Sequence, residues 1–280
     1  INLGGRVLLH DLATGRDVRI FRFPGDGRRG SSPVAWFAGG SMFAAGQGNQ
    51  VAVFKRDSPE PIATAMVEQS PYQLAFSMDG TRLIALSQGR KPTLTVLDWK
   101  ACVVISSRQF APGETPLRLL PELVAVQVMT PEPQLVAQDL QGLAKQRFPT
   151  ANLAFIAFAA RSNLVAVLLK DGTLRVHELG GESPLWSREG PQPVREVLVK
   201  FTDDGSRVVV STSPEGRTNV SVFDAQTGKL ERTFDVPRLG QVIALDVRWA
   251  IAEDFNRVWA HDLEHLPSVG TAKTPFSGAV

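Results

Sequence analysis

Three of the four histidines in the chain stand directly before an acidic residue, and such pairs could support acid–base or metal chemistry. Imidazole titrates near neutral pH and binds zinc, and a neighbouring carboxylate can orient its ring. Each pair, however, ends a short alternating segment, and the three segments lie far apart in the sequence. Because they occupy equivalent positions in separate repeats, we do not expect the side chains to converge, and we assign them a structural role. The pairs are His10-Asp11, His177-Glu178 and His261-Asp262, and the fourth histidine is His265.

The other residues that could do chemistry also have structural explanations. Asp79, Asp171 and Asp204 each precede a glycine, and Asp-Gly is typical of a tight turn because Asp hydrogen-bonds its own backbone. Cys102 is the single cysteine, and we expect it in an apolar strand over 101–105 as an unreactive core or flanking residue. The sequence contains no Gly-x-Ser-x-Gly elbow, no Cys/His cluster and no phosphate-binding glycine loop. We therefore predict no catalytic residue, no metal site and no cofactor.

The first thirty residues are basic, with six arginines against three aspartates. Arginine bonds carboxylates and phosphates through two parallel N–H groups, so this segment could bind an acidic partner. The alternative is an ordinary solvated edge of a sheet. Few aromatic side chains accompany the arginines, which argues against stacking of single-stranded nucleic acid. The candidate partner-binding residues are Arg16, Arg19, Arg22, Arg28 and Arg29.

These residues are positioned by one short segment that the chain repeats seven times. Val220–Asp224 alternates apolar and polar residues, ends in an acid and precedes the turn Thr227-Gly228, which indicates a half-buried strand followed by a reversal. The last residues of the copies fall at 11, 55, 98, 139, 178, 224 and 262, about 42 residues apart. This spacing is typical of a propeller blade of four short strands. One small sheet cannot bury both faces, so neighbouring sheets must cover each other.

The sequence therefore predicts an all-β fold, a seven-bladed WD40-like β-propeller whose first blade is incomplete in this chain. The blades are expected near 1–23, 33–67, 71–109, 116–148, 152–188, 194–235 and 240–265. Residues 1–265 would form a single domain and 266–280 an extended tail or linker. Pro121, Pro131 and Pro133 lack a backbone donor, so we expect short strands in the fourth blade. The chain starts at Ile1 in a strand, and we expect upstream residues of a longer protein to complete the first blade.

Composition is compatible with this fold and gives little support to other classes. The 280 residues are 43% apolar and 21% charged, with a net charge of +2, so neither nucleic acid nor membrane is indicated as a partner. The longest apolar run, 153–160, is eight residues and too short to cross a bilayer. A single cysteine is compatible with a reducing compartment.

The chain resembles the WD40-repeat propeller family along almost its whole length. The Asp-Gly hairpins, the acidic strand ends and the turns Thr14-Gly15 and Thr227-Gly228 carry the resemblance. The family's Gly-His and Trp-Asp dipeptides are absent, and Lys55 replaces the acid in the second blade. The third blade, 72–99, is similar to blades of the large cilia- and flagella-associated WD-repeat proteins. That narrower resemblance implies an axonemal scaffold and adds no site residue.

We interpret the chain as a non-catalytic protein–protein interaction scaffold in a multi-subunit assembly. The resemblance adds a cytoplasmic, cytoskeletal or ciliary location, with tubulin or axonemal subunits as partners. One alternative is a propeller enzyme, lactonase- or lyase-like, with its site at the mouth of the central channel. Another is a secreted or periplasmic ligand-binding propeller. An enzyme would need two or more acids, amides or imidazoles to face one channel mouth.

Overall fold

The described part of the chain is entirely β-structure. The computed structural model describes residues 6–11, 16–22, 33–37, 40–87, 89–129, 132–159, 162–190, 198–202, 204–212, 218–236, 241–245, 249–254 and 257–262. Every regular element in these ranges is a strand, and the strand pairs are antiparallel. This confirms the predicted all-β class. The tail expected at 266–280 lies outside the described residues.

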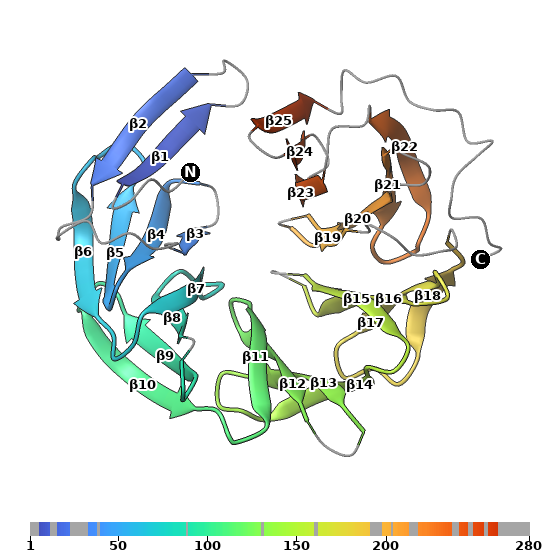
Figure 1. The fold of residues 1–280 in the computed structure, drawn as a ribbon, viewed down its shortest axis with the longest axis horizontal. Coiled ribbons are helices and arrows are strands. Elements are labelled where there is room, and N and C mark those ends of the chain that lie inside the picture. Colours follow the sequence, from blue (N-terminus) through green and yellow to red (C-terminus); the bar gives the residue numbers. More distant parts are fainter. Residues whose placement is uncertain are drawn as a thin grey trace. The chain divides into compact units, whose positions relative to one another are not determined.

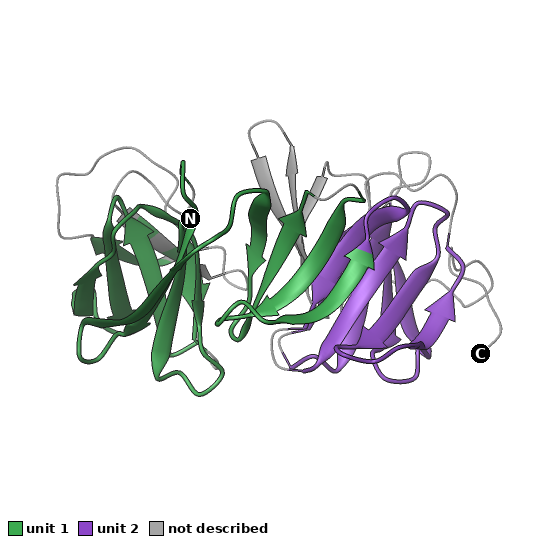
Figure 2. Ribbon diagram, turned by 90° about the horizontal axis from the view of Figure 1, so that it is seen from below, with its two compact units in different colours: residues 1–148 green, residues 149–280 purple. Residues whose placement is uncertain are grey.

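The chain divides into two compact units, residues 1–148 and 149–280 (Figure 2). In the described residues of unit 1 the strands form four successive sheets, labelled in Figure 1. They are β1 (Arg6–Asp11) with β2 (Arg16–Arg22); β3 (Val34–Trp36), β4 (Met42–Gln47), β5 (Gln50–Lys55) and β6 (Pro61–Met66); β7 (Pro71–Phe76), β8 (Arg82–Ser87), β9 (Thr93–Asp98) and β10 (Val103–Gln109); and β11 (Glu114–Leu119), β12 (Leu123–Val128), β13 (Gln134–Asp139) and β14 (Ala144–Pro149).

Unit 2 contains three further sheets in its described residues. They are β15 (Leu153–Phe158), β16 (Leu164–Leu169), β17 (Leu174–Glu178) and β18 (Pro184–Arg188); β19 (Leu198–Phe201), β20 (Arg207–Thr212), β21 (Thr218–Asp224) and β22 (Leu230–Val236); and β23 (Gln241–Leu245), β24 (Trp249–Asp254) and β25 (Arg257–Asp262). The expectation of a single domain over 1–265 stays a prediction.

The seven repeated segments occupy equivalent places in successive sheets. They are β1, β5, β9, β13, β17, β21 and β25. In each four-stranded sheet the repeated segment is the third strand, between the second strand and the outer fourth strand. In the first sheet β1 pairs with the strand that follows it, and in the last described sheet β25 is again third. The repeat in the sequence is therefore the repeat in the structure.

In unit 1 the hydrophobic core consists of layers between neighbouring sheets. The layer between the first two sheets is aromatic. Phe21 of β2 meets Phe43 of β4 edge-on at 4.6 Å between ring centroids, and Phe43 stacks on Phe54 of β5 at 5.1 Å. All three rings are fully buried. Further layers join the second sheet to the third and the third to the fourth. Each sheet thus buries its faces against its neighbours, as a propeller blade must.

Unit 2 repeats this arrangement between its first two sheets. Trp186 of β18 packs with Val176 and Phe223, and its indole N–H donates to the Ala225 carbonyl oxygen at 2.8 Å. The buried indole thus has its donor satisfied by the adjoining sheet. This hydrogen bond holds the outer parts of two neighbouring blades together.

Glycine is required where a turn of one sheet meets the sheet before it. Gly80, in the Asp-Gly turn between β7 and β8, has φ +69°, and a Cβ there would lie 2.1 Å from a ring carbon of Phe37. Gly205, in the matching turn of unit 2, has φ +73°, and its Cβ would lie 2.5 Å from the Ser162 hydroxyl oxygen. Both positions need a backbone conformation and a closeness of approach that only glycine allows.

The prediction of short strands in the fourth blade is wrong. All four strands, β11 to β14, contain six residues. Pro121 lies in the connection between strands, Pro133 precedes β13, and Pro131 lies outside the described residues. The proline inside the first strand, Pro116, tolerates its missing donor because β11 is an edge strand.

Candidate functional site

The predicted arginine site is divided by the structure. Among the five arginines, Arg16, Arg19 and Arg22 lie on β2, while Arg28 and Arg29 lie outside the described residues. Arg19 and Phe21 face the neighbouring sheet, where the Arg19 guanidinium donates to the Asp57 carbonyl oxygen. Arg22 is exposed on the opposite face of the strand. Arg19 and Arg22 therefore do not form one surface, and their role in partner binding stays a prediction.

The Asp-Gly carboxylates serve the turns, as the sequence predicts. Asp79 accepts hydrogen bonds from the Ser77 hydroxyl at 2.6 Å and from the Thr81 backbone N–H at 3.0 Å. Asp204 accepts from the Thr202 hydroxyl at 2.5 Å and from the Ser206 N–H at 3.0 Å. These donors lower the pKa of both carboxyl groups to about 2, and the hydroxyl has the largest effect in each case. Both carboxylates are therefore committed to local structure.

The acids that end the third strands close the next turn. Asp98 accepts the N–H groups of Lys100 and Ala101 at 3.0 and 2.9 Å, and Asp224 accepts those of Gln226 and Thr227 at 3.1 and 2.8 Å. An acid at this place satisfies backbone donors that have no strand partner. This is the physical reason for the acid in the repeat.

The histidine–acid pairs lie in three different sheets, at the ends of β1, β17 and β25. His177 is partly buried, and burial lowers the pKa of its imidazole below the ordinary value. In the described ranges no three His, Cys, Asp or Glu side chains gather as a metal site would require. No helix in these ranges is long and apolar enough to span a membrane.

The prediction that Cys102 lies in an apolar strand over 101–105 is wrong. It is exposed in the turn between β9 and β10 and has φ +58°. Because Asp98 caps this turn, the reversal extends through Cys102 and the strand begins only at Val103. The apolar segment after the turn is also exposed rather than buried.

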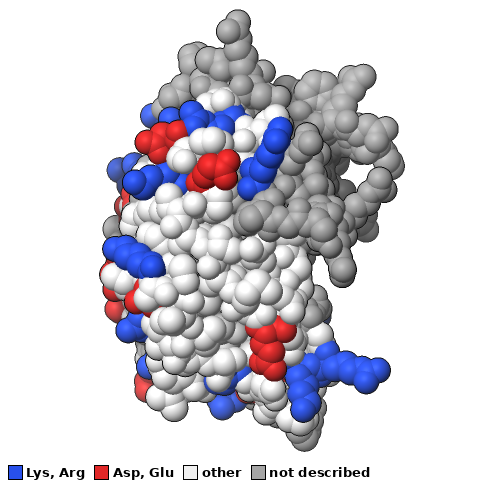
Figure 3. Space-filling model, turned by 90° about the vertical axis from the view of Figure 1, so that its left-hand side faces the viewer, with Lys and Arg blue, Asp and Glu red and all other residues white. Residues whose placement is uncertain are grey.

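The exposed apolar residues of β6 and β10 form a surface that the sequence reading missed. We call it the outer wall of unit 1, since both are fourth strands of their sheets (Figure 1). It comprises Ile62 (41% exposed), Met66 (66%), Val103 (53%), Val104 (48%) and Ile105 (52%). Figure 3 looks onto this side of the molecule, where a broad area without charged side chains is bordered by Lys, Arg, Asp and Glu at its margins.

The outer wall contains a structural feature that recurs in other sheets. In five outer strands the residue seven positions after the third-strand end has no ladder partner and forms a β-bulge. These residues are Val18, Ile62, Ile105, Leu185 and Glu231. The first four are large apolar residues between 41% and 52% exposed. A bulge redirects a side chain and bends an edge strand, so it presents these side chains to solvent.

The outer wall carries fewer charged residues than the outer strands β2, β14 and β22. β6 has no charged residue, and β10 has only Arg108, which stacks on Phe110 and donates to the Gln138 side chain. In contrast, β14 carries Lys145 and Arg147, and β22 carries Glu231 and Arg232. Edge strands normally carry charges that prevent pairing with other chains. Two consecutive edge strands with one charged residue between them would have been a usable signal in the sequence.

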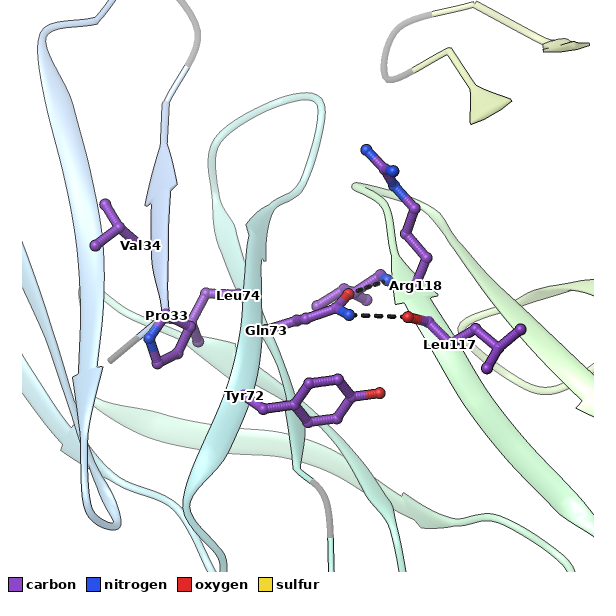
Figure 4. A pocket seen from close by; sticks show the side chains of 8 residues that line it. Pro33, Val34, Tyr72, Gln73, Leu74, Leu117 and Arg118 are labelled. Carbon is purple, nitrogen blue, oxygen red and sulfur yellow. Dashed lines mark hydrogen bonds between the residues drawn. The ribbon is translucent and has the colours of Figure 1, made fainter. Parts of the chain in front are cut away.

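A second candidate site is a pocket of about 360 Å³ on the first-strand edge of unit 1 (Figure 4). Three neighbouring first strands, β3, β7 and β11, supply its lining. Tyr72 and Gln73 attach β7 to β11: the Tyr72 hydroxyl donates to the Pro116 carbonyl oxygen at 2.8 Å. Burial raises the pKa of Tyr72 to about 12. The lining residues are Pro33, Val34, Tyr72, Gln73, Leu74, Leu117, Arg118 and Leu119. This set offers no carboxylate, imidazole or thiol for acid–base catalysis.

Comparison with known proteins supports the fold but identifies neither a family nor a related curated protein. No family model matches the sequence, and no curated protein matches it. Solved structures do match, 1317 chains in all. One is the crystal structure of the Cps50 (Swd1) β-propeller domain from Myceliophteria thermophila, with a TM-score of 0.56 and 13% identity over 85% of both chains. The chain therefore has the WD40-like β-propeller fold, with the seven sheets of its described residues as blades.

Proposed function

We propose that this chain is a non-catalytic β-propeller that binds another protein through the outer wall of unit 1, within a larger assembly. The observation that carries the proposal is the exposed apolar surface of the edge strands β6 and β10, which carry a single charged residue, Arg108, between them. Contiguous exposed apolar surface on a folded protein commonly marks an interaction site. The expected partner presents an apolar segment, and the free edge of β10 can also pair with its backbone.

The test replaces a bulge residue of the outer wall with a charge. Ile105→Lys places an ammonium group in the centre of the interface, where burial without a partner is costly. We expect at least about a tenfold loss of partner affinity, with unchanged thermal stability because Ile105 is exposed. Binding is measured by quantitative co-purification from the source cells, with the retained protein identified and its stoichiometry determined.

Leu185→Lys is the matched control, because Leu185 is an exposed apolar bulge residue at the same repeat position in unit 2. Equal loss with both variants, or retention by Ile105→Lys, would contradict the proposal. Light scattering after size exclusion tests whether the outer wall instead binds a second copy of this chain. A wild-type dimer that Ile105→Lys dissociates would assign the wall to a second copy of this chain. A monomer that hydrolyses small esters would favour the enzyme alternative.

A more specific form of this proposal is that the assembly belongs to an axoneme. The partners would then be tubulin or axonemal subunits, and the location ciliary or cytoskeletal. It is supported by the resemblance of residues 72–99 and by the basic first thirty residues. If arginines such as Arg22 hold an acidic tubulin tail, affinity should fall steeply with salt, because exposed charges are screened beyond about 8 Å at physiological ionic strength. Binding of a tubulin-tail peptide at 50 and 300 mM salt would be compared, and salt-independent affinity would rule this version out.

A further inference from the structure

The pocket on the first-strand edge is lined by an arginine whose guanidinium has no partner among the described residues. Arg118 lies on β11 and is exposed at one end of the pocket. In the described part of the chain its guanidinium makes no hydrogen bond or ion pair. The surrounding strands nevertheless desolvate it enough to lower its pKa. Because the side chain is also exposed, solvent screens much of this cost, and the guanidinium remains accessible to an anion.

A pinned β-bulge sets the direction of Arg118. The ladder between β11 and β12 skips Leu117, pairing Pro116 with Val126 and Arg118 with Ala125. The side-chain amide of Gln73 satisfies the bulged segment: its Nε2 donates to the Leu117 carbonyl oxygen at 2.9 Å, and its Oε1 accepts the Leu119 N–H at 2.6 Å. These two bonds are drawn in Figure 4, where Arg118 extends away from them. Bulges of this kind redirect side chains next to binding sites.

The lining of the pocket selects the class of anion. One guanidinium supplies one positive charge and a planar fork that matches a carboxylate. Most of the other lining residues are apolar, namely Pro33, Val34, Leu74, Leu117 and Leu119. A phosphate dianion would lack a second cation here, whereas a carboxylate on an aliphatic chain would have both of its parts accommodated. The volume is in the range of small-ligand pockets, roughly 300–1,000 Å³.

We propose that this pocket binds a carboxylate attached to an apolar chain, with Arg118 as the anion-binding residue and Gln73 as the residue that positions it. The site goes beyond the outer wall and is independent of it, since it lies on the first strands β3, β7 and β11, whereas the outer wall lies on the fourth strands β6 and β10. The carboxylate can belong to a Glu side chain of an extended peptide or to a free aliphatic acid.

The experiment uses two matched pairs of probes on the full chain. The peptide pair is acetyl-Ala-Leu-Glu-Leu-Ala-amide and its Gln counterpart, and the small-molecule pair is hexanoate and hexanamide. Calorimetric titration gives the affinities, and side-chain NMR signals of Arg118 and Gln73 report the location. We expect at least one acid to bind about tenfold or more tightly than its amide. The tighter of the two acids identifies the source of the carboxylate.

Variants of the arginine complete the test. Arg118→Gln should remove the preference for the acid, and Arg118→Lys should retain part of it. Arg90→Gln, which removes an exposed arginine of unit 1 outside the pocket, should leave it unchanged. Because Arg118 is exposed and has no described partner, its loss should not unfold the protein, which melting curves will verify. Equal affinity for acid and amide, no binding at millimolar concentration, or a preference that survives Arg118→Gln would overturn the proposal.

Discussion

At the scale of single residues, a few side chains perform the same structural task in successive sheets. The Asp-Gly turns show this best, because Asp79 and Asp204 organise the turn while Gly80 and Gly205 contact the preceding sheet. Acid and glycine are adjacent because the carboxylate accepts the hydrogen bonds of the turn and the glycine, which has no Cβ, allows the turn to approach the preceding sheet. These residues connect local turn geometry to the stacking of blades.

Gly80→Ala should therefore destabilise the protein more than Gly40→Ala does. The two glycines have nearly the same φ, +69° and +67°, but a Cβ at Gly40 meets nothing within 4 Å. The conformational penalty alone is about 1–2 kcal/mol at either position. At Gly80 the clash with Phe37 adds about 1–3 kcal/mol of overpacking. Urea unfolding of both variants measures the difference, and equal losses would show that Phe37 moves aside without cost.

At the scale of strands and sheets, the edges rather than the centres carry the candidate functions. The third strands β5, β9 and β13 are buried over most of their length, so they offer little surface that could distinguish one blade from another. The fourth strands differ in charge and carry the outer wall, and the first strands carry the pocket. Bulges occur on both edges, as Ile105 on β10 and Leu117 on β11 illustrate.

Gln73→Leu should weaken the attachment of β7 to β11 and reduce ligand binding in the pocket. The substitution leaves the Leu117 carbonyl and the Leu119 N–H without their partner, at a cost of about 1–3 kcal/mol. We expect a lower urea midpoint and reduced affinity for carboxylate probes. Gln69→Leu is the control, since the Gln69 amide makes one exposed bond to the Lys91 carbonyl oxygen. A Gln73 variant as stable as the control would mean that water replaces the amide.

At the scale of the whole molecule, stability is distributed in layers between neighbouring sheets within each unit. Phe21, Phe43 and Phe54 form the layer between the first two sheets, and Trp186 and Phe223 belong to a layer in unit 2. In such arrays each repeat is stabilised mainly by its neighbours. A defect in one layer should therefore be felt locally before it is felt throughout the chain.

Phe43→Ala tests this, because the ring is fully buried and contacts two other rings. The substitution should cost about 3–5 kcal/mol. Hydrogen exchange should accelerate first in β1 to β6, while β16 and β20 keep their protection. Uniform acceleration across both units would show that the chain unfolds as one cooperative body.

The sequence predicted the repeat and the strands well because their signals are local. Alternation, an acid at the strand end and a following glycine all act within ten residues, and the seven segments lie where they were expected. The site depends instead on contacts between distant segments. The bonds from Gln73 to β11 join residues 44 and 46 apart, and no local pattern announces them. The position of Cys102 was predicted wrongly for a different, local reason, since the Asp98 side chain accepts the Lys100 and Ala101 N–H groups and lengthens the turn.

The bulge seven residues after the third-strand end has a practical consequence. Since the residue there has no directly opposite partner in the ladder, and the four apolar residues at this position are at least 41% exposed, the side chain can be exchanged without disturbing a cross-strand pair. Val18, Ile62, Ile105, Leu185 and Glu231 already differ in size and charge on a common backbone. Glu231 forms an ion pair with Arg207, whereas the four apolar positions can be replaced independently, and new recognition surfaces could be engineered from them without redesigning the core.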